Sequence, residues 1–376
     1  MDAVGTGFSI LRAGRRKHDD LPGRRAIHGG ASDVYPILYG RIKPQASAIA
    51  VSPHLAVNDT LIQINPAAMP PAAIASAAED PPARSPRLPE WLRKGQTHFE
   101  SVHLLKRDLR GKQLHTVCES ARCPNLHECF HRGAATFMIL GNLCTRGCTF
   151  CSVPKANPAK TEMPIDPGEP AHVAEMAAAM NLRYVVITSV NRDDLWDGGS
   201  THFAETVRQV RGGLPQARIE VLTPDFCGDM KAVARVLDAG PDVFNHNMET
   251  VPRLYRKVRP QAHYQQSLDV LRFARGHRPE ALTKSGFMVG LGETRDEVQQ
   301  LLRDLRAHEV DVATIGQYLQ PTRRNRPVSE YVTPAQFDEY RDFGLALGFR
   351  MVFSGPLVRS SYMADEVNAQ ARENGL

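Results

Sequence analysis

The stretch CESARCPNLHECFHRGAATFMILGNLCTRGCTFC, Cys118–Cys151, holds six of the seven cysteines of this 376-residue chain. The six form two triplets, one with the spacing C-x4-C-x5-C and one with C-x3-C-x2-C, on either side of the apolar run TFMIL. That run predicts a short buried strand, so the second triplet follows the carboxyl end of a strand. The first triplet is Cys118, Cys123 and Cys129, and the second is Cys144, Cys148 and Cys151.

Downstream of this stretch, strand-like and helix-like segments alternate along the chain. Short runs rich in β-branched residues predict strands, and segments with apolar residues at helical spacing separate them. Serial strand–helix units are typical of an α/β protein with parallel strands, either a doubly wound sheet or a complete or partial barrel; periodicity does not choose between them. In both architectures the functional groups lie at the carboxyl ends of the strands. The predicted strands are 136–140, 184–190, 218–224, 242–247, 283–292, 310–319 and 349–356, and the predicted helices are 169–181, 199–213, 229–240, 265–277 and 294–309.

The overall composition excludes several classes of protein. With 42% apolar and 23% charged residues, the chain has the composition of a globular protein. No apolar run approaches the roughly 20 residues that a membrane-spanning helix needs, so we expect no membrane span. The formal net charge of +5 is mild for this length and gives no reason to expect a nucleic-acid partner.

The first 86 residues differ from the rest of the chain. They are rich in Ala, Pro and Ser and have little apolar periodicity, which predicts a largely disordered extension. The Arg-rich start faintly resembles an organelle transit peptide, but Asp19 and Asp20 weaken that interpretation. We therefore expect a cytoplasmic protein, with the mitochondrial matrix or a plastid as the alternative if the extension is a transit peptide.

Three kinds of chemistry compete for the two cysteine triplets. Disulfides need an oxidising compartment and are typical of small secreted chains, which this chain does not resemble. Structural zinc needs four ligands, and His115, His127 or His131 would have to complete such a site. Iron–sulfur clusters are favoured, because soft thiolates suit them and closely spaced cysteines can reach separate irons. A triplet leaves one iron of a four-iron cluster open to another ligand.

The motifs around the cysteines resemble a known family. The second triplet, in CTRGCTFC, resembles the cysteine motif of radical S-adenosylmethionine (SAM) enzymes. The first triplet, in CESARCPNLHEC, resembles the auxiliary-cluster motif of the lipoyl synthase family, and RSSY at 359–362 matches a further motif of that family. Other similar segments, in the family's order, extend the resemblance over residues 89–365. They are PEWLRKG, SVNRDDLWDGG, TPDF, FNHNMETV, KSGFMVGLGET, IGQYLQP and GPLVRSSY.

The resemblance implies a particular fold and domain organisation. The implied fold is a partial (β/α)6 TIM-type barrel of parallel strands, with an N-terminal cysteine-motif extension and a C-terminal segment that covers the barrel. The expected domains are the disordered extension at 1–86, an auxiliary-cluster segment at 87–135, the barrel at 136–365 and a tail at 366–376.

The resemblance also implies the cofactors and their ligands. Two [4Fe–4S] clusters and SAM are expected. By the family's pattern, the second triplet holds the cluster whose open iron binds SAM, and the first triplet holds the auxiliary cluster together with a serine of the RSSY motif. That serine maps onto Ser361, with Ser360 as the alternative.

The implied enzyme is a sulfurtransferase. A 5′-deoxyadenosyl radical from SAM removes hydrogen from C6 and later C8 of an octanoyl chain on a carrier lysine, and sulfide of the auxiliary cluster is inserted at each carbon. The implied partners are octanoylated lipoyl carrier domains (2-oxoacid dehydrogenase E2 and the glycine-cleavage H protein), a low-potential electron donor such as ferredoxin or flavodoxin, and an iron–sulfur carrier. Two other functions stay open: another two-cluster radical enzyme, such as a methylthiotransferase, and a non-enzymatic iron–sulfur or zinc scaffold.

Polar residues and glycines at the carboxyl ends of the predicted strands are candidates for binding the cofactor. The alternative for the polar candidates is that they form hydrogen bonds at the surface or at the barrel rim. The alternative for the glycines is that they form a turn that begins a helix at Glu293 and Thr294. The candidates are Asn191, Arg192, Asp193, Asn247, Glu249, Gly290 and Gly292.

Two basic stretches and the seventh cysteine complete the sequence features. RLYRKVRP at 253–260 and RRNRP at 323–327 could dock an acidic carrier domain, although a solvated basic face explains them as well. Neither shows the aromatic interleaving expected of a groove for single-stranded nucleic acid. Cys227 is interpreted as a structural thiol.

Overall fold

The computed structural model describes residues 85–93, 99–131 and 136–361. The chain divides into two compact units, residues 1–74 and 75–376. The first unit, the predicted extension apart from its last two residues and the predicted C-terminal tail lie outside the described residues. The predicted domain bounds therefore stay predictions, and the description that follows concerns the second unit.

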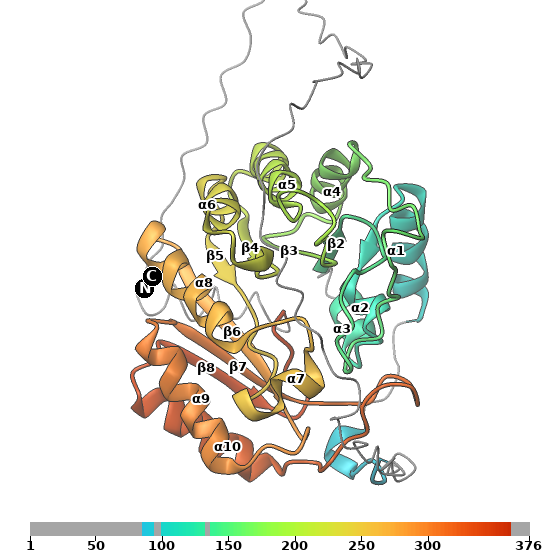
Figure 1. Ribbon diagram of the computed structural model, residues 1–376. Helices are drawn as coiled ribbons and strands as arrows, with labels where there is room; N and C mark the ends of the chain where they lie inside the picture. The colour runs from blue at the N-terminus through green and yellow to red at the C-terminus, as the bar shows by residue number, and fades with distance from the viewer. Residues whose placement is uncertain (1–84, 94–98, 132–135, 362–376) are drawn as a thin grey trace, which may run out of the picture. The chain divides into compact units, whose positions relative to one another are not determined.

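Eight strands form one sheet in which each strand lies beside its neighbours in the sequence. Strands β2–β8 run parallel, whereas β1 pairs with β2 in the antiparallel direction. No pairing joins β8 to β1 or β2 within the described ranges, so the curved sheet in Figure 1 is open. The strands are β1 (His115–Thr116), β2 (Thr136–Ile139), β3 (Tyr184–Ser189), β4 (Arg218–Leu222), β5 (Val243–Asn245), β6 (Leu282–Val289), β7 (Val312–Gln317) and β8 (Met351–Gly355).

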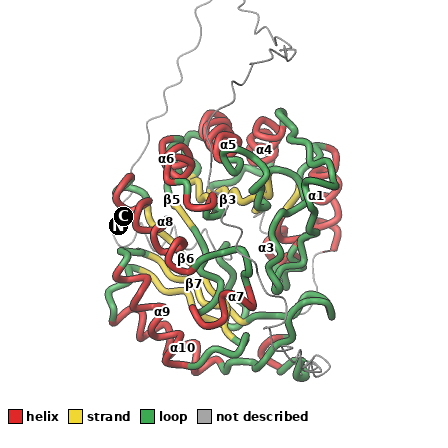
Figure 2. Tube along the Cα trace, in the orientation of Figure 1, coloured by secondary structure: helices red, strands yellow, loops and turns green. Residues whose placement is uncertain are grey.

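A long helix follows each of the strands β2–β7 and leads to the next strand, as the alternation of colours in Figure 2 shows. These helices lie on the outer side of the sheet (Figure 1). The chain thus forms six βα units and a final strand, which confirms the predicted α/β partial barrel of parallel strands. Every predicted strand and helix is present. The helices are α4 (Glu169–Ala179), α5 (Ser200–Gly213), α6 (Met230–Asp238), α8 (Tyr264–His277), α9 (Arg295–Ala307) and α10 (Pro334–Ala346).

Shorter elements lie before the barrel and in its loops. The segment before β2 contains one long and two short helices beside β1. Single turns of helix interrupt the loops after β4 and β5. These elements are η1 (Glu90–Leu92), α1 (Phe99–Gly111), α2 (Val117–Ser120), α3 (Leu126–His131), η2 (Phe226–Gly228), η3 (Pro252–Leu254) and α7 (Tyr255–Val258).

The apolar pattern of the sequence does not predict α10. Only Phe337, Tyr340 and Gly344 of this helix are buried, so its apolar stripe is narrow. Its start is nevertheless encoded locally, because the Thr333 side chain accepts a hydrogen bond from the backbone N–H of Gln336 and proline opens the first turn.

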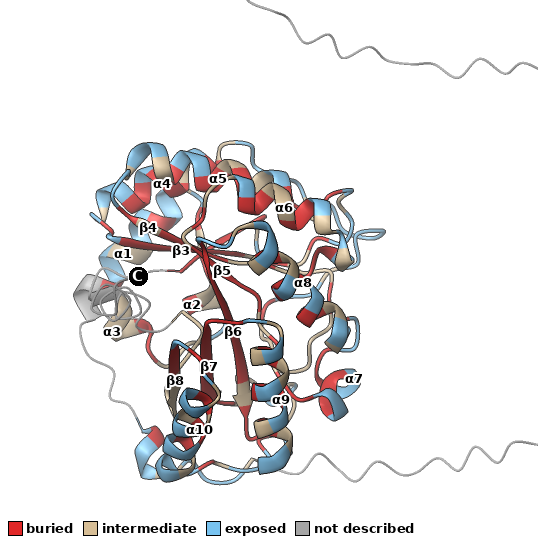
Figure 3. Cartoon of the chain, turned by 90° about the vertical axis from the view of Figure 1, so that its left-hand side faces the viewer, coloured by how far each residue is buried: buried red, intermediate tan, exposed pale blue. Residues whose placement is uncertain are grey.

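Apolar side chains fill the space between the sheet and its helices. All four residues of β2 and all six of β7 are buried, as expected for parallel strands covered on both faces. Figure 3 shows the strands as a largely buried layer and the helices as exposed on their outer sides. The barrel wall is therefore an ordinary packed core, and polar residues within it need an explanation.

One charged pair lies inside the barrel with no contact to solvent. The Lys284 ammonium lies 3.0 Å from a carboxylate oxygen of Glu220, and both side chains are 0% exposed. Tyr184 donates a hydrogen bond to Glu220 over 2.7 Å, and Asn245 donates one over 2.8 Å. Donors from β3, β5 and β6 thus occupy the Glu220 carboxylate. A shift in the register of any of these strands would leave the buried charge without one of its partners.

Replacing Lys284 with methionine should strongly destabilise the fold. The Glu220 charge would stay buried without its cation, and breaking a buried pair in this way costs about 3–5 kcal/mol. The free energy of unfolding from urea titration measures this loss. R208M is the matched control, because Arg208 pairs with Glu205 at 3.5 Å on the surface, and its loss should cost at most about 0.5 kcal/mol. Equal losses of unfolding free energy in K284M and R208M would contradict the stabilising role of the buried Lys284–Glu220 pair.

Candidate functional site

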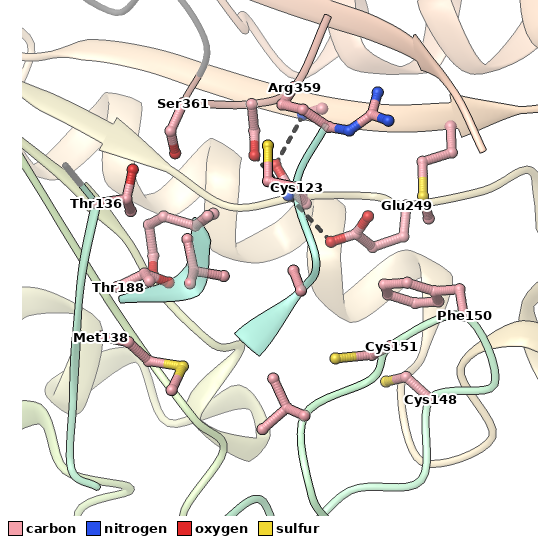
Figure 4. A pocket seen from close by; sticks show the side chains of 18 of the residues that line it. Cys123, Thr136, Met138, Cys148, Phe150, Cys151, Thr188, Glu249, Arg359 and Ser361 are labelled. Carbon is pink, nitrogen blue, oxygen red and sulfur yellow. Dashed lines mark hydrogen bonds between the residues drawn. The ribbon is translucent and has the colours of Figure 1, made fainter. Parts of the chain in front are cut away.

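One cavity of about 520 Å³ lies on the inner side of the open barrel. It extends from the carboxyl ends of the strands down their inward-facing side chains, among them Thr136 and Met138 of β2. Serines Ser360 and Ser361 line it as well. In Figure 4 the thiols of Cys123, Cys148 and Cys151 lie around the same space. All six clustered cysteines line this cavity: Cys118, Cys123, Cys129, Cys144, Cys148 and Cys151.

The loop that carries the second triplet follows β2 and is held by backbone hydrogen bonds on both sides. Cys144 N–H donates to the carbonyl of Pro154 over 2.9 Å, and Thr145 N–H donates to that of Asn191 over 3.1 Å. Thr149 N–H donates to the carbonyl of Val258 at the end of α7 over 2.9 Å. Hydrogen bonds within the loop and to neighbouring segments therefore fix its position.

Arg146, between the first two cysteines of this loop, is buried and joined to two carboxylates. Its guanidinium lies 2.7 Å from an Asp193 oxygen and 2.6 Å from an Asp225 oxygen. Burial alone would lower the pKa of Arg146, but the hydrogen bonds to Asp225 and Asp193 outweigh it and raise the pKa. Burial would likewise raise the pKa of Asp225, yet Arg146 holds it at about 2. The ion pairs of Arg146 with Asp193 and Asp225 thus hold the cysteine loop against the loops after β3 and β4.

The first triplet lies on α2, α3 and the turn between them. Ser152, directly after the second triplet, donates a hydrogen bond to the carbonyl of Ser120 over 2.5 Å. Asn125 donates one to the carbonyl of Leu357 over 2.8 Å. The first triplet is therefore bound on one side to the second triplet and on the other to the C-terminal segment.

The six clustered cysteines are free; Cys118 is buried and the other five are half-buried. Burial raises the pKa of Cys118 and of Cys151 to about 12, and it raises that of Cys148 as well. These three groups are thiols at neutral pH, so a metal centre that binds them must displace protons.

The spacing of the donors tests which metal centre fits. Two ligands of one zinc ion lie roughly 4 Å apart, because each Zn–S bond is about 2.3 Å long. Within the described ranges, no three His, Cys, Asp or Glu side chains converge in that way. A four-iron cluster does not require that convergence, because each thiolate binds a different iron. The geometry thus gives the zinc alternative no support.

The C-terminal segment that carries the two serines crosses β6 and β7 where these strands have glycine. A Cβ atom on Gly316 would lie 2.1 Å from the carbonyl oxygen of Val358. A Cβ atom on Gly286 would lie 2.5 Å from the Thr314 hydroxyl and 3.3 Å from Ser360 Cβ. A real Cβ does not approach another atom as closely as 2.1 Å, so the segment can take this path only because residue 316 lacks a side chain. At Gly286 the closest contacts are with Thr314 and Asn247, and the contact with the segment is only tight.

The two serines of the motif have different surroundings. The Asn247 amide donates hydrogen bonds to Ser360 Oγ over 3.3 Å and to Glu249 over 3.0 Å. Ser361 makes no hydrogen bond to any described residue, and Figure 4 shows its hydroxyl directed into the cavity. Ser361 is therefore the serine with an oxygen available for a ligand.

Three of the seven predicted cofactor-binding residues line the cavity, namely Asn191, Asn247 and Glu249. Glu249 is half-buried with a φ of 65°, and loss of solvent around its carboxyl raises its pKa against the opposing effect of Arg259. Arg259 in turn donates to the carbonyl of Asn247 over 2.8 Å. These residues bring together the end of β5, α7 and the C-terminal segment.

The other four predicted residues are not brought to the cavity. Arg192 pairs with Asp194 at 2.8 Å, and Asp193 pairs with Arg146. A Cβ on Gly290 would lie 2.5 Å from the carbonyl oxygen of Glu330, so the protein itself requires this glycine. Gly292 is similarly placed in the turn before α9. Cofactor binding by Arg192, Asp193, Gly290 and Gly292 stays a prediction without support from the geometry.

The helix-start interpretation of the glycine turn is confirmed. Glu293 accepts hydrogen bonds from the backbone N–H groups of Gly290 and Leu291. Thr294 is the N-cap of α9 and forms a reciprocal capping box with Glu297. The polar groups of this turn are therefore satisfied within it.

Six buried polar atoms of cavity-lining residues have no hydrogen-bond partner among the described residues. They are Ser189 Oγ, Asn191 Oδ1, Thr223 Oγ1, His246 Nε2, Arg259 Nε and Thr314 Oγ1. The Nδ1 of His246 must carry the proton, because it lies 2.9 Å from the carbonyl of Thr223. Burial lowers the pKa of His246 to about 4, so its Nε2 is a neutral acceptor. Unpaired buried polar atoms that gather around one cavity are consistent with a place for a polar ligand.

Arg146, Asp225, Ser189, Thr223 and His246 are not among the residues predicted above. Ser189, Thr223 and Asp225 lie at the ends of predicted strands or directly after them, which is the available signal. Arg146 lies inside the cysteine motif itself, but its two carboxylate partners are distant in sequence. Cys227, interpreted as structural, is exposed, outside the cavity lining, and within 3.4 Å of both Asp193 and Arg146.

The barrel and the cysteine loop at the end of β2 define a class of protein. Residues 138–305 match the model of the radical SAM superfamily. The chain is thus a radical SAM protein, and membership implies SAM and a [4Fe–4S] cluster as cofactors. Residues 65–123 match the N-terminal domain of lipoyl synthase of that family.

Known proteins identify the family within that class. The lipoyl synthase of Rubrobacter xylanophilus is 53% identical over 288 residues, which are 77% of this chain and 88% of that protein. The lipoyl synthase of Thiobacillus denitrificans is 54% identical over 291 residues, covering 77% and 92%. The chain belongs to the lipoyl synthase family, which replaces the methylthiotransferase and scaffold alternatives.

A solved structure of methylornithine synthase is also similar to the chain. Its TM-score is 0.44 at 15% identity, and the match covers 63% of this chain and 79% of that one. A likeness at this TM-score adds nothing to the assignment.

Replacing Gly316 with alanine should displace the serine-bearing segment. The new Cβ would collide with backbone, at Val358, which a side-chain rotation does not relieve. Hydrogen exchange measured by mass spectrometry should become faster in residues 356–361, and the melting temperature should fall. G212A is the control, because a Cβ on Gly212 in α5 meets nothing within 4 Å, and alanine favours a helix. Unchanged hydrogen exchange of residues 356–361 in G316A would contradict the conclusion that this segment needs a glycine at position 316.

Proposed function

We propose that the chain converts an octanoyl group, amide-linked to a lysine of a carrier protein, into a lipoyl group by inserting sulfur at C6 and C8. The observation that carries this proposal is the single cavity lined by both cysteine triplets and by the RSSY serines. A carbon radical made at one centre can take sulfur from another only if both face one enclosed space. The shared cavity therefore supports a reaction that uses both triplets.

The second triplet would hold the [4Fe–4S] cluster that binds SAM, and SAM bound there supplies a 5′-deoxyadenosyl radical on reduction. The four unpartnered acceptors on the ends of β3, β4 and β5 support binding of a ligand rich in hydrogen-bond donors beside this loop. The neutral Nε2 of His246 and the Oδ1 of Asn191 suit amino and hydroxyl donors. Asn247 and Glu249, which follow β5 and line the cavity, would make further contacts with SAM.

Cys118, Cys123, Cys129 and Ser361 would hold an auxiliary [4Fe–4S] cluster that donates sulfur. The hydroxyl of Ser361 has no hydrogen bond to the rest of the described structure, whereas Ser360 is engaged by Asn247. This difference favours Ser361 over Ser360 as the ligand. A serine oxygen is a harder donor than a thiolate and matches iron less well, so it suits a ligand that must dissociate when sulfur is removed.

The remaining lining of the cavity supports an aliphatic substrate. Side chains of Met138, Val186, Leu222 and Met288 face the cavity from four different strands. A mostly apolar lining with a few polar groups at one end is typical of a site for a chain with a polar head. The octanoyl group would lie against this wall, with its amide toward the rim.

The partners follow from this proposal. We expect octanoylated lipoyl carrier domains as substrates, a low-potential electron donor such as ferredoxin or flavodoxin, and an iron–sulfur carrier that rebuilds the auxiliary cluster. No helix among the described residues is long and apolar enough to cross a membrane. A cytoplasmic location and the absence of a nucleic-acid partner stay predictions.

The first experiment uses the anaerobically reconstituted full chain with SAM, dithionite and an octanoyl-lysyl peptide. Mass spectrometry should find the lipoyl peptide and two 5′-deoxyadenosine molecules for each product. C148A should lose 5′-deoxyadenosine formation as well as product, because the SAM centre is lost. C123A should still form 5′-deoxyadenosine but no lipoyl peptide, and sulfur insertion by C123A would refute the role of the first triplet.

Replacing Ser361 with cysteine should separate binding of the auxiliary cluster from its use. A thiolate would hold the iron more firmly, so iron content should be kept while the second sulfur insertion slows by about tenfold or more, equivalent to about 1.4 kcal/mol. The peptide carrying a single sulfur should accumulate, as read by mass spectrometry. S360C is the matched control and should behave as wild type; unchanged lipoyl formation by S361C would disprove the lability argument.

A further inference from the structure

We propose that the outer face of the second cysteine loop is a docking surface for an acidic protein that carries a low-potential one-electron cofactor. This inference rests on the proposed function and adds to it the place where the electron enters. The surface is formed by four exposed cations, called here the cationic rim: Arg256, Lys257, Arg323 and Arg324.

Two segments far apart in sequence bring the rim against the cysteine loop. Thr149, between Cys148 and Cys151, donates from its hydroxyl to the carbonyl of Lys257 over 3.0 Å. The carbonyl of Thr149 accepts a hydrogen bond from the backbone N–H of Arg326 over 3.0 Å. The loop between the last two cysteines therefore lies between α7 and the turn at 322–326. Arg256 and Lys257 belong to α7, and Arg323 and Arg324 belong to the turn.

A second contact fixes the same arrangement. The Asn325 amide donates hydrogen bonds to the carbonyl of Cys151 over 3.0 Å and to that of Thr149 over 3.2 Å. Asn325 directly follows the two arginines of the turn. Its side chain faces the cysteine loop, whereas Arg323 and Arg324 are exposed. The rim cations thus lie on the solvent side of a backbone layer whose inner side carries the thiols.

The rim cations form no ion pair with any described residue. Neighbouring basic residues differ: Arg253 pairs with Glu297 at 2.7 Å, and Arg326 donates to the carbonyl of Leu291 over 3.0 Å. Four adjacent uncompensated cations repel one another, and an acidic partner would relieve that repulsion. Clusters of one sign raise the rate of encounter with a partner of the opposite charge.

The position of the rim favours an electron donor over the acyl carrier. None of the four rim residues lines the cavity, whereas Lys155 and Gln320 do. An octanoyl-lysine must enter the cavity, so its carrier must dock over the opening. An electron donor needs only to approach the cluster from outside, and the thin loop 148–151 is the barrier between the rim and the thiols.

In the proposed step the reduced donor loses one electron and the cluster held by Cys144, Cys148 and Cys151 gains it, with no atom transferred.

Charge reversal of the rim tests the inference. R256E/K257E and R323E/R324E should weaken binding of flavodoxin to the holoenzyme, measured by calorimetry, and slow reduction of the cluster by flavodoxin, followed by stopped-flow absorbance. We expect a loss of about tenfold or more at low ionic strength. The difference from wild type should vanish at about 0.5 M salt, where exposed charges are screened.

Two controls separate docking from damage to the site. R183E/R208E reverses two exposed cations on other parts of the barrel and should bind flavodoxin as wild type does. Dithionite is small and needs no docking surface, so dithionite-driven release of 5′-deoxyadenosine should be equal in all variants. If a reversal variant folds poorly, R256Q/K257Q gives the same test with milder substitutions.

Several outcomes would overturn the inference. One is unchanged flavodoxin binding and reduction in both reversal variants. Another is a loss seen only with the octanoylated carrier protein and not with the octanoyl-lysyl peptide, which would make the rim the carrier's surface. A failure of the proposed function is distinguishable, because wild type would then release no 5′-deoxyadenosine even with dithionite.

Discussion

The six strand–helix units do not close into a barrel, and the rest of the structure depends on that gap. A closed eight-stranded barrel fills its interior with its own side chains, whereas this sheet ends at β8 on one side and at the two-residue β1 on the other. The opening is occupied by segments from both ends of the fold, the first cysteine triplet and the RSSY segment, which meet where Asn125 donates to Leu357. The cavity exists because these segments cover the opening without filling it.

Charge within the covered space is arranged around the metal ligands. Arg146 is neutralised by Asp193 and Asp225, and Arg259 by backbone carbonyls and the nearby Glu249. Arg359, in the RSSY motif, has no carboxylate partner among the described residues, and burial lowers its pKa. Clusters held by thiolates are anionic, so the Arg359 cation, which has no acidic partner among the described residues, would stabilise a cluster at the first triplet.

Much of the fold follows from the sequence because its signals are local. β-Branched runs predict every strand of the parallel sheet, and the cysteine spacing predicts two metal-binding triplets, which both line the cavity. Periodicity could not decide between a doubly wound sheet and a complete or partial barrel, because both architectures repeat the same unit. Arg146 could not be selected either, since its role depends on Asp193 and Asp225, which follow the next two strands of the sheet. The contacts of Arg192 and Gly290 show that polar residues and glycines at strand ends can also serve the turn itself.

The two triplets are anchored to very different degrees, and this fits the different work proposed for them. The second triplet lies in a loop held by buried ion pairs and by backbone hydrogen bonds to three other loops. The first lies on helices of four and six residues, α2 and α3, and its proposed fourth ligand, Ser361, belongs to a segment that crosses β7 at a glycine. Helices this short are not stable on their own and depend on the segments that pack against them. A centre that binds SAM in every turnover needs constant geometry, whereas a centre that gives up its sulfur and is rebuilt needs ligands that can withdraw. The firmer anchoring therefore fits the proposed SAM centre, and the looser anchoring fits the proposed sulfur donor.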